Sequence, residues 1–206
     1  MAARRRLLST IVGALVLGVL AACGASSGPA ALPPEKKGPP FLYVALGGDD
    51  NGTGRTTLAS AWPQIFFRSD LPRTAQFVNL ARPRSGITQI LNDEVDHATR
   101  LQPDLVTITL IDDAERATPT TTVEHDLAAV LQRLARHHRT TILVGTVPPN
   151  VGTSTATEAL NQTITRVADA ASVTLVDLPV DNSTSASGAA KIAEIFARAY
   201  RQTRRS

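Results

Sequence analysis

Five short apolar runs, each bounded by turn-forming residues, constrain the fold of this sequence more than any other feature. They are rich in β-branched residues and apolar at nearly every position, which is typical of strands covered on both faces. The runs are FLYVAL at 41–46, QFVNLA at 76–81, DLVTITL at 104–110, TTILVGTV at 140–147 and VTLVDL at 173–178. We therefore expect five buried β-strands.

Apolar residues recur at helical spacing between these runs, and each set predicts the buried face of a helix. The sets are Val123, Leu127, Val130, Leu131 and Leu134, then Leu160, Ile164, Val167, Ala168 and Ala171, a shorter set of Ile87, Leu91, Val95 and Ala98, and a last one of Ile192, Ile195, Phe196, Ala199 and Tyr200. Regular alternation of strand and helix predicts an α/β fold, in which a parallel sheet carries helices on both sides. Ligands and chemistry then gather at the carboxyl ends of the strands.

Residues 1–22 have the pattern of a bacterial secretory signal. Three arginines precede an apolar stretch at 7–20, which is too short for a membrane span and is followed by a polar, proline-rich segment. The four residues that end at Cys23 resemble a lipobox, in which cleavage before the cysteine accompanies attachment of a diacylglyceryl group to its thiol. We expect lipidation of Cys23, and the other interpretation is an ordinary signal with an incidental cysteine.

Residues 24–40, GASSGPAALPPEKKGPP, lack any apolar period and are typical of a flexible tether. The sequence thus predicts three parts: a lipoprotein signal peptide at 1–22, Cys23 with a tether that reaches residue 40, and one domain at 41–206. The expected location is extracytoplasmic, with the lipid anchor in the bacterial cell membrane.

The charge balance changes when the signal peptide is removed. Three of the 21 basic residues lie in residues 1–22, so the remaining basic residues equal the 18 acidic ones in number. A formally neutral chain gives no electrostatic reason to expect a nucleic-acid partner. The C-terminal segment RAYRQTRRS stays weakly basic, and its pattern is more typical of a solvated helix end than of a binding site.

Five aspartates follow the predicted strands: Asp49, Asp50, Asp112, Asp113 and Asp181. One interpretation is that they are solvated loop residues or helix caps, since aspartate is favoured at both places. The other is that several of them converge, in which case their mutual repulsion requires a cation or raised pKa values. The sequence leaves open whether the chain binds a metal.

Four segments look like the motif blocks of one known family. YVALGGDD is similar to its first block, VNLARPRSGITQIL to its second, LQPDLVTITLIDDA to its third and VDNSTSASGAAKIAEIFARAY to its fifth. Over residues 41–200 the sequence therefore resembles the SGNH or GDSL hydrolases, a family of esterases and lipases. The resemblance implies a three-layer α/β sandwich around a five-stranded, parallel, doubly wound sheet of the flavodoxin-like kind, and it implies no cofactor.

In that family a serine attacks an ester carbonyl, a histidine removes its proton and an aspartate orients the histidine, while a glycine amide and an asparagine side chain hold the oxyanion. The resemblance puts Asp49 at the position of the nucleophile. It puts Gly86 at the oxyanion glycine and Asp112 at the oxyanion asparagine. Asp181 takes the position of the triad aspartate.

The position of the catalytic histidine falls on Ser183 or Thr184. Without an imidazole, a carboxylate at position 49 is a poor nucleophile toward an ester. Asp112 would place negative charge where the transition state needs a hydrogen-bond donor. The resemblance therefore implies a non-catalytic protein that binds a cell-envelope glycan, lipid or protein. The alternative is a divergent ester hydrolase that depends on carboxylates or on a metal.

The four histidines are His97, His125, His137 and His138, and all are expected on helices or at a helix end. Of these, only His125 lies near the start of its helix, where its side chain could turn toward the strand ends. Trp62 belongs to the segment ASAWPQIFF, and we expect it to pack between helices, with stacking on a substrate as the other interpretation.

Overall fold

The computed structural model describes residues 40–48, 57–136, 139–179 and 185–205. Its centre is a sheet of five parallel strands in the order β2-β1-β3-β4-β5. The strands are β1 (Leu42–Leu46), β2 (Gln76–Asn79), β3 (Leu105–Ile108), β4 (Thr141–Gly145) and β5 (Thr174–Val176). Each strand lies inside one of the five apolar runs, so the predicted strands and the α/β fold class are confirmed.

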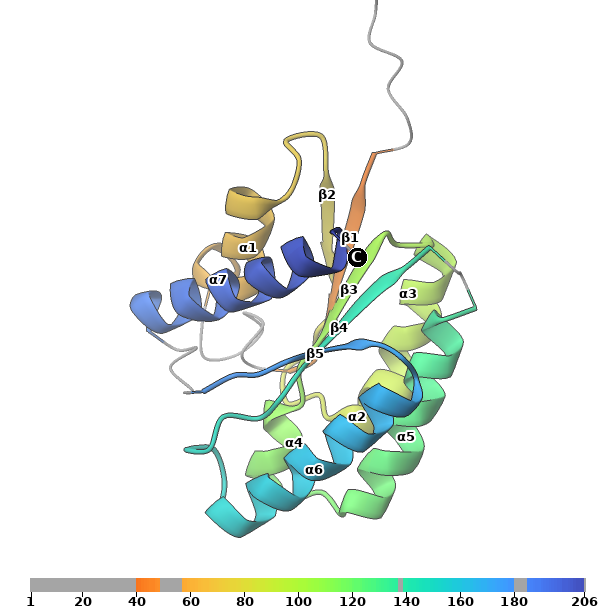
Figure 1. The fold of residues 1–206 in the computed structure, drawn as a ribbon, viewed down its shortest axis with the longest axis vertical. Coiled ribbons are helices and arrows are strands. Elements are labelled where there is room, and N and C mark those ends of the chain that lie inside the picture. The colour runs from red at the N-terminus through yellow and green to blue at the C-terminus, as the bar shows by residue number, and fades with distance from the viewer. Residues whose placement is uncertain (1–39, 49–56, 137–138, 180–184, 206) are drawn as a thin grey trace, which may run out of the picture. The chain divides into compact units, whose positions relative to one another are not determined.

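Helices cover both faces of the sheet (Figure 1). One face carries α1 (Trp62–Asp70), which follows the short 3-10 turn η2 (Leu58–Ser60), together with α7 (Ala186–Thr203). The other face carries α2 (Ile87–Gln89), α3 (Val95–Leu101), α4 (Ile111–Glu115), α5 (Thr120–Leu134) and α6 (Ser154–Ala170). The result is the expected three-layer sandwich. Among the described helices, none combines the length and the apolar character that a membrane span requires.

The side chains of each strand point alternately into two separate cores. Val44 and Leu46 of β1 pack with the helices of the α5 and α6 side, whereas Tyr43 and Ala45 pack with α1 and α7. Because successive side chains of a strand point to opposite faces, a strand covered on both faces is apolar at nearly every position, and a polar exception such as the fully buried Thr107 is hydrogen-bonded, here with Tyr43. This is why the five runs show little alternation of polar and apolar residues.

Trp62 lies at the contact between α1 and α7. Its ring stacks on that of Phe196, with the centroids 4.2 Å apart and the planes at 13°. The side chain of Trp62 is fully buried. The expectation that this tryptophan packs between helices is therefore confirmed.

The segment between β2 and β3 departs from the simple helix that its apolar spacing predicts. α2 and α3 are joined by a π-helical turn, η3 (Ile90–Glu94). A π turn closes its hydrogen bonds over five residues instead of four, so it shifts every following side chain around the helix axis. Ile90 and Glu94 are both buried, which means that the turn brings a carboxyl group to the inner side of this segment.

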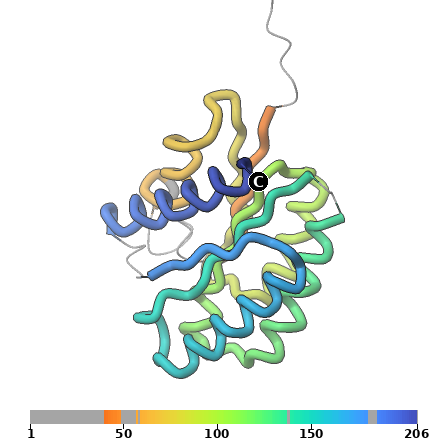
Figure 2. The backbone as a smooth tube through the Cα atoms, in the orientation of Figure 1, coloured from red at the N-terminus to blue at the C-terminus, as the bar shows by residue number. Residues whose placement is uncertain are grey.

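β1 lies between β2 and β3, because the chain leaves β1 toward one edge of the sheet and later returns to its other side (Figure 2). The carboxyl ends of β1 and β3 therefore flank a topological switch point. Open α/β sheets bind their ligands at such points. The connections that follow Leu46 and Ile108 are thus the place to look for a site.

Candidate functional site

The connections after β1 and β3 meet through Gly48 and Asp112. A Cβ atom at residue 48 would lie 1.6 Å from Oδ2 of Asp112 and 3.0 Å from the backbone oxygen of Ser85. The Asp112 carboxyl group thus fills the space that a side chain at residue 48 would need. Asp112 belongs to the first turn of α4 and is only 4% exposed. Three segments that are far apart in sequence therefore converge at the switch point.

Gly86, the expected oxyanion glycine, directly precedes α2 on the same side of this site. Its amide N–H donates to Oε1 of Gln89 at 3.2 Å. A Cβ atom at residue 86 would lie 2.3 Å from Nη2 of Arg116 and 2.7 Å from Oδ1 of Asp113. The amide of Gly86 is therefore engaged within the chain, and charged groups pack against its α-carbon.

Asp113 caps α2 from the neighbouring helix, because its Oδ2 accepts the amide of Ile87 at 2.8 Å. Burial raises the pKa of the Asp113 carboxyl, and this effect outweighs the lowering by its hydrogen bonds from Ile87 and Thr118. Asp113 is buried like Asp112, with exposed fractions of 1% and 4%. Of the interpretation of these acids as solvated loop residues or helix caps, the first half is wrong for both, because α4 begins at Ile111 and both carboxyl groups are buried, whereas the second half holds for Asp113.

Glu94 joins the connection after β1 to the segment before α2 through two hydrogen bonds. Its Oε2 accepts the amide of Gly47 at 3.1 Å, and its Oε1 accepts the hydroxyl of Ser85 at 2.5 Å. Glu94 is 1% exposed, and burial raises the pKa of its carboxyl to about 7, although both hydrogen bonds act in the opposite direction. One buried acid thus holds the residue before Gly48 and the residue before Gly86.

Sequence reasoning missed Glu94, although a signal was present. Residue 94 is three positions after Leu91 and seven after Ile87, so helical spacing puts its charge on the apolar stripe of that segment. A carboxyl group on a buried stripe needs hydrogen-bond partners. The π turn that aims it at Gly47 and Ser85 carries no comparable signal in the sequence.

Several of the expected site residues lie outside the described part of the chain. These are Asp49, Asp50, Asp181, Ser183 and Thr184, together with Cys23, His137 and His138. Of the four site positions that the resemblance implied, the structure therefore locates two, Gly86 and Asp112. Both lie at the switch point.

The two described histidines do not belong to this site. His97 is exposed on α3. The side chain of His125 is 82% exposed, lies 2.9 Å from Oδ1 of Asp126, and lines a groove between α5 and α6. The other oxygen of Asp126 accepts the hydroxyl of Thr88. The possibility that His125 turns toward the strand ends is therefore wrong, since the side chain points outward from α5.

Within the residues that the structure describes, no group of three or more histidine, cysteine, aspartate or glutamate side chains is arranged to hold a metal ion. Asp49 and Asp181 are outside that part of the chain. A cation shared by the strand-end acids thus stays a prediction.

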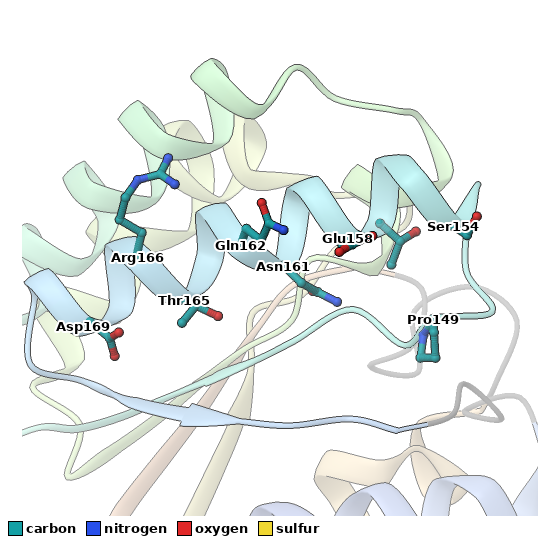
Figure 3. A pocket seen from close by; sticks show the side chains of 9 residues that line it. Pro149, Ser154, Glu158, Asn161, Gln162, Thr165, Arg166 and Asp169 are labelled. Carbon is teal, nitrogen blue, oxygen red and sulfur yellow. The ribbon is translucent and has the colours of Figure 1, made fainter.

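A second hollow runs along α6, away from Gly48 and Asp112. It is an open groove of about 840 Å³, and Figure 3 shows its lining side chains along α6 with Pro149 on the connection after β4. Asn161 fixes that connection, since its side-chain amide donates to and accepts from the backbone of Val147 at 2.7 Å in both directions. Among the described residues, the lining of the groove consists of polar side chains and Pro149 and contains no aromatic ring. It therefore lacks the flat apolar surfaces on which sugar rings or acyl chains usually pack.

Comparison with known proteins identifies the relatives of this chain. The sequence model of the GDSL-like Lipase/Acylhydrolase family matches residues 43–199. A search of curated protein sequences gave no match.

Solved structures of low sequence identity share the fold. The psychrotrophic esterase EstA from Pseudoalteromonas sp. aligns with a TM-score of 0.65 at 12% identity, over 80% of this chain and 99% of that one. A lipase/acylhydrolase from Enterococcus faecalis aligns with a TM-score of 0.61 at 15% identity, over 77% and 94% of the two chains. The acetyl xylan esterase AlAXEase aligns with a TM-score of 0.63 at 12% identity, over 77% and 99%. At such identities the likeness concerns the fold alone.

Proposed function

Because the chain belongs to the GDSL-like lipase/acylhydrolase family, we propose that it uses an SGNH-type esterase fold for binding and not for hydrolysis. In this proposal the protein is an extracytoplasmic lipoprotein, anchored through Cys23 to the bacterial cell membrane. Its ligand is a glycan, lipid or protein of the cell envelope. The binding site contains the family positions Asp49, Gly86, Asp112 and Asp181, and no cofactor takes part.

The observation that carries the proposal is the carboxyl group of Asp112 beside Gly48. In the family pattern this position supplies a neutral donor to the oxyanion, and loss of one such donor slows acyl transfer on the order of 100-fold to 1,000-fold. A carboxylate adds repulsion, because two like charges about 4 Å apart repel by about 4 kcal/mol at an effective dielectric constant of about 20. In its ionised form Asp112 would thus destabilise the transition state that an esterase has to stabilise.

The amide of Gly86 supports the same conclusion. This N–H would be the second donor to the oxyanion, but it donates to the side chain of Gln89. A substrate oxygen would have to displace an acceptor that the chain itself supplies, at a cost of about 1 kcal/mol or more.

A divergent, carboxylate-dependent hydrolase is the second candidate, and the pair of Ser85 and Glu94 favours it. The hydroxyl of Ser85 donates to Glu94 at 2.5 Å, and the pKa of Glu94 is raised to about 7 by burial. A hydroxyl nucleophile and a general base are thus within hydrogen-bond reach. Ser85 is only 2% exposed, however, so its hydroxyl is closed to a substrate. We therefore place the binding role first.

Ester hydrolysis by the purified mature chain tests the two candidates. We expect no turnover of short-chain p-nitrophenyl or naphthyl esters beyond that of the Asp49→Ala variant. Turnover that Asp49→Ala abolishes would contradict the binding role. Turnover that Ser85→Ala and Glu94→Gln abolish, with a pH–rate profile set by one carboxyl group, would establish the second candidate.

Binding is tested by thermal melting in the presence of envelope glycans, envelope lipids and envelope protein extracts. A ligand that binds only the folded protein raises the melting temperature, because it adds RT ln(1 + [L]/Kd) to the free energy of unfolding. The Asp112→Asn variant is the control for binding at the switch point, since it keeps the size of the side chain and removes its charge. Melting that none of the three classes changes would count against the binding role.

A further inference from the structure

The described chain begins at the amino ends of the strands, opposite the candidate site. We call this end of the sheet its amino edge, and the end formed by the carboxyl ends of the strands its carboxyl edge. Pro40 precedes β1 and lines a groove of about 670 Å³ at the amino ends of the strands, together with Arg136 and Arg139. Both arginines lie in the connection between α5 and β4. The point where the chain enters the domain thus has positive charge on one side.

The last turn of α7 brings more positive charge to the other side of the same point. The ring of Tyr200 lies 6.0 Å from that of Phe41, the first residue after Pro40, and Figure 1 shows the end of α7 beside β1. The guanidinium group of Arg204 lies 6.0 Å from the centre of the Tyr200 ring and donates to its hydroxyl at 3.2 Å. Arg205 follows and is exposed. The chain entry therefore lies between two groups of arginines.

Few carboxylates offset the arginines at this edge. Among the described residues, those near it are Asp70, Asp96, Asp104 and Asp169. Asp96 is paired with Arg133, in the last turn of α5, at 3.1 Å. Asp70 is paired with Arg201 at 2.6 Å, and Asp104 accepts the amide of Leu42 at 2.7 Å. The opposite edge holds the buried acids of the site. Since basic and acidic residues balance once residues 1–22 are removed, the excess of positive charge at the amino edge is a matter of distribution, not of composition.

We propose that the amino edge of the sheet, with Arg136 and Arg139 on one side and Arg204 and Arg205 on the other, docks on the anionic phospholipid headgroups of the membrane that carries the protein. The inference rests on the lipid anchor of the proposed function, because the anchored segment joins the domain at Pro40, between the two groups of arginines. An arginine close to an anionic bilayer contributes about 1 kcal/mol to binding, which is about a fivefold change in affinity. The sequence of the C-terminal segment alone favours a solvated helix end, and only the fold shows that Arg136, Arg139 and the chain entry lie near it.

Docking of this edge also orients the site. The carboxyl ends of the strands, where Gly48 and Asp112 meet, then face away from the bilayer. A ligand would reach them from the space beyond the membrane surface and not from the lipid phase.

Vesicle binding by the mature chain, residues 23–206 with Cys23→Ser so that no lipid is attached, tests the proposal. Vesicles of phosphatidylcholine alone are compared with vesicles that also contain phosphatidylglycerol, at low and at high salt. We expect binding only to the anionic vesicles, and release at high salt because the exposed charges are then screened. Arg136→Gln with Arg139→Gln, and separately Arg204→Gln with Arg205→Gln, should each weaken binding about 25-fold.

The matched control is Lys191→Gln with Arg198→Gln, which removes the same charge from exposed positions of α7 further from its C-terminal end. We expect this pair to leave vesicle binding nearly unchanged, with circular dichroism showing that all variants are folded. Equal binding to neutral vesicles, no binding to anionic ones, or an equal loss in the control pair would overturn the proposal. Binding to duplex DNA without binding to vesicles would overturn it too. Failure of the anchor or of the binding role appears in other measurements, namely lipidation of Cys23 and ester turnover.

Discussion

Residue 48 has to be a glycine because the Asp112 carboxyl group occupies the space that a Cβ atom at this position would need. Two residues that are far apart in the sequence are thus in contact at the switch point. Neither position is understandable alone, since a glycine after a strand and an aspartate at a helix start are both common. The contact makes a specific statement about stability possible.

Gly48→Ala should destabilise the fold by about 1–3 kcal/mol, the usual cost of an added methyl group in a packed region. Urea unfolding measures the change. In the background of Asp112→Ala, which removes the carboxyl group, the same substitution should cost clearly less, because coupled residues are not additive. An equal cost in both backgrounds would show that Asp112 is not the obstacle.

Glu94 gives the protein a pH dependence of its own. Its pKa is raised from 4.5 to about 7, so between these values the folded protein keeps a proton that the unfolded chain has lost. Stability is then lost as pH rises through this window, by at most about 3 kcal/mol. The raised pKa of Asp113 acts in the same direction.

Glu94→Gln should therefore flatten the fall in stability between about pH 5 and pH 8. Urea unfolding at several pH values measures the slope for the variant and the wild type. Glu124→Gln is the matched control, because this exposed carboxylate pairs with Arg166 on the surface and should leave the slope as it is. Identical slopes in wild type and Glu94→Gln would rule the glutamate out as their origin.

At the scale of elements, the two cores differ in how they are closed. The core on the α1 side contains several aromatic contacts, among which the stack of Trp62 on Phe196 joins α1 to α7 and the stack of Tyr43 on Phe77 joins β1 to β2. The other core is assembled from aliphatic side chains of α2, α3, α5 and α6. Damage to the stack of Trp62 on Phe196 should therefore loosen α7 from the sheet more than any single aliphatic change loosens α5.

Trp62→Ala should lower the free energy of unfolding by about 3–5 kcal/mol, and Trp62→Phe by much less, because the smaller ring still fills part of the stack. Chemical unfolding followed by circular dichroism measures both. In the wild type Trp62 is the sole tryptophan, so its fluorescence reports the separation of α1 from α7 directly. A Trp62→Ala variant as stable as the wild type would mean that the stack contributes little.

An element could be predicted where its burial requires a recognisable pattern of apolar residues. The five strands and the helices around Leu127, Ile164 and Phe196 follow from apolar runs and stripes, because both faces of the sheet are covered. The π turn at Ile90–Glu94 was not predictable, since a one-residue shift leaves no mark in local propensity. The burial of Asp112 depends on where α4 packs, which is a tertiary property.

At the scale of the whole molecule, the sheet separates two ends with different chemistry. The carboxyl edge holds buried acids at the switch point, and the amino edge holds exposed arginines around the chain entry. Gly86 and Asp112, which the resemblance assigned to the site, lie at the first edge, and their role in a site stays a prediction. The arginines of the second edge could not be predicted to lie together, because they come from segments that are not adjacent in the sequence.

Cys23→Ser should release the protein from the membrane fraction after a high-salt wash or leave it as an uncleaved precursor. Its domain should keep the melting temperature of the wild type, because the tether separates residue 23 from the first strand. Cell fractionation and immunoblotting measure the release. Normal processing with full membrane retention after a high-salt wash would contradict a lipid anchor at this cysteine.

Divalent cations test whether the strand-end acids converge. If Asp49 and Asp181 join Asp112, three carboxyl groups repel one another, and calcium or magnesium should raise the melting temperature by binding the folded state. Differential scanning fluorimetry with and without a chelator measures the shift, and Asp112→Asn should reduce it. A melting temperature that calcium, magnesium and manganese leave unchanged would dispose of the cation.

The position of β1 between two neighbours has a mechanical consequence. A pull on the chain at Pro40 acts along β1, which is hydrogen-bonded to β2 on one side and to β3 on the other. The load then falls on both ladders at once and in shear, whereas a strand at the edge could be peeled off one bond at a time. A domain held at this point should therefore resist extension strongly, and the same pull applied at the end of α7 should strip the helix from the sheet first.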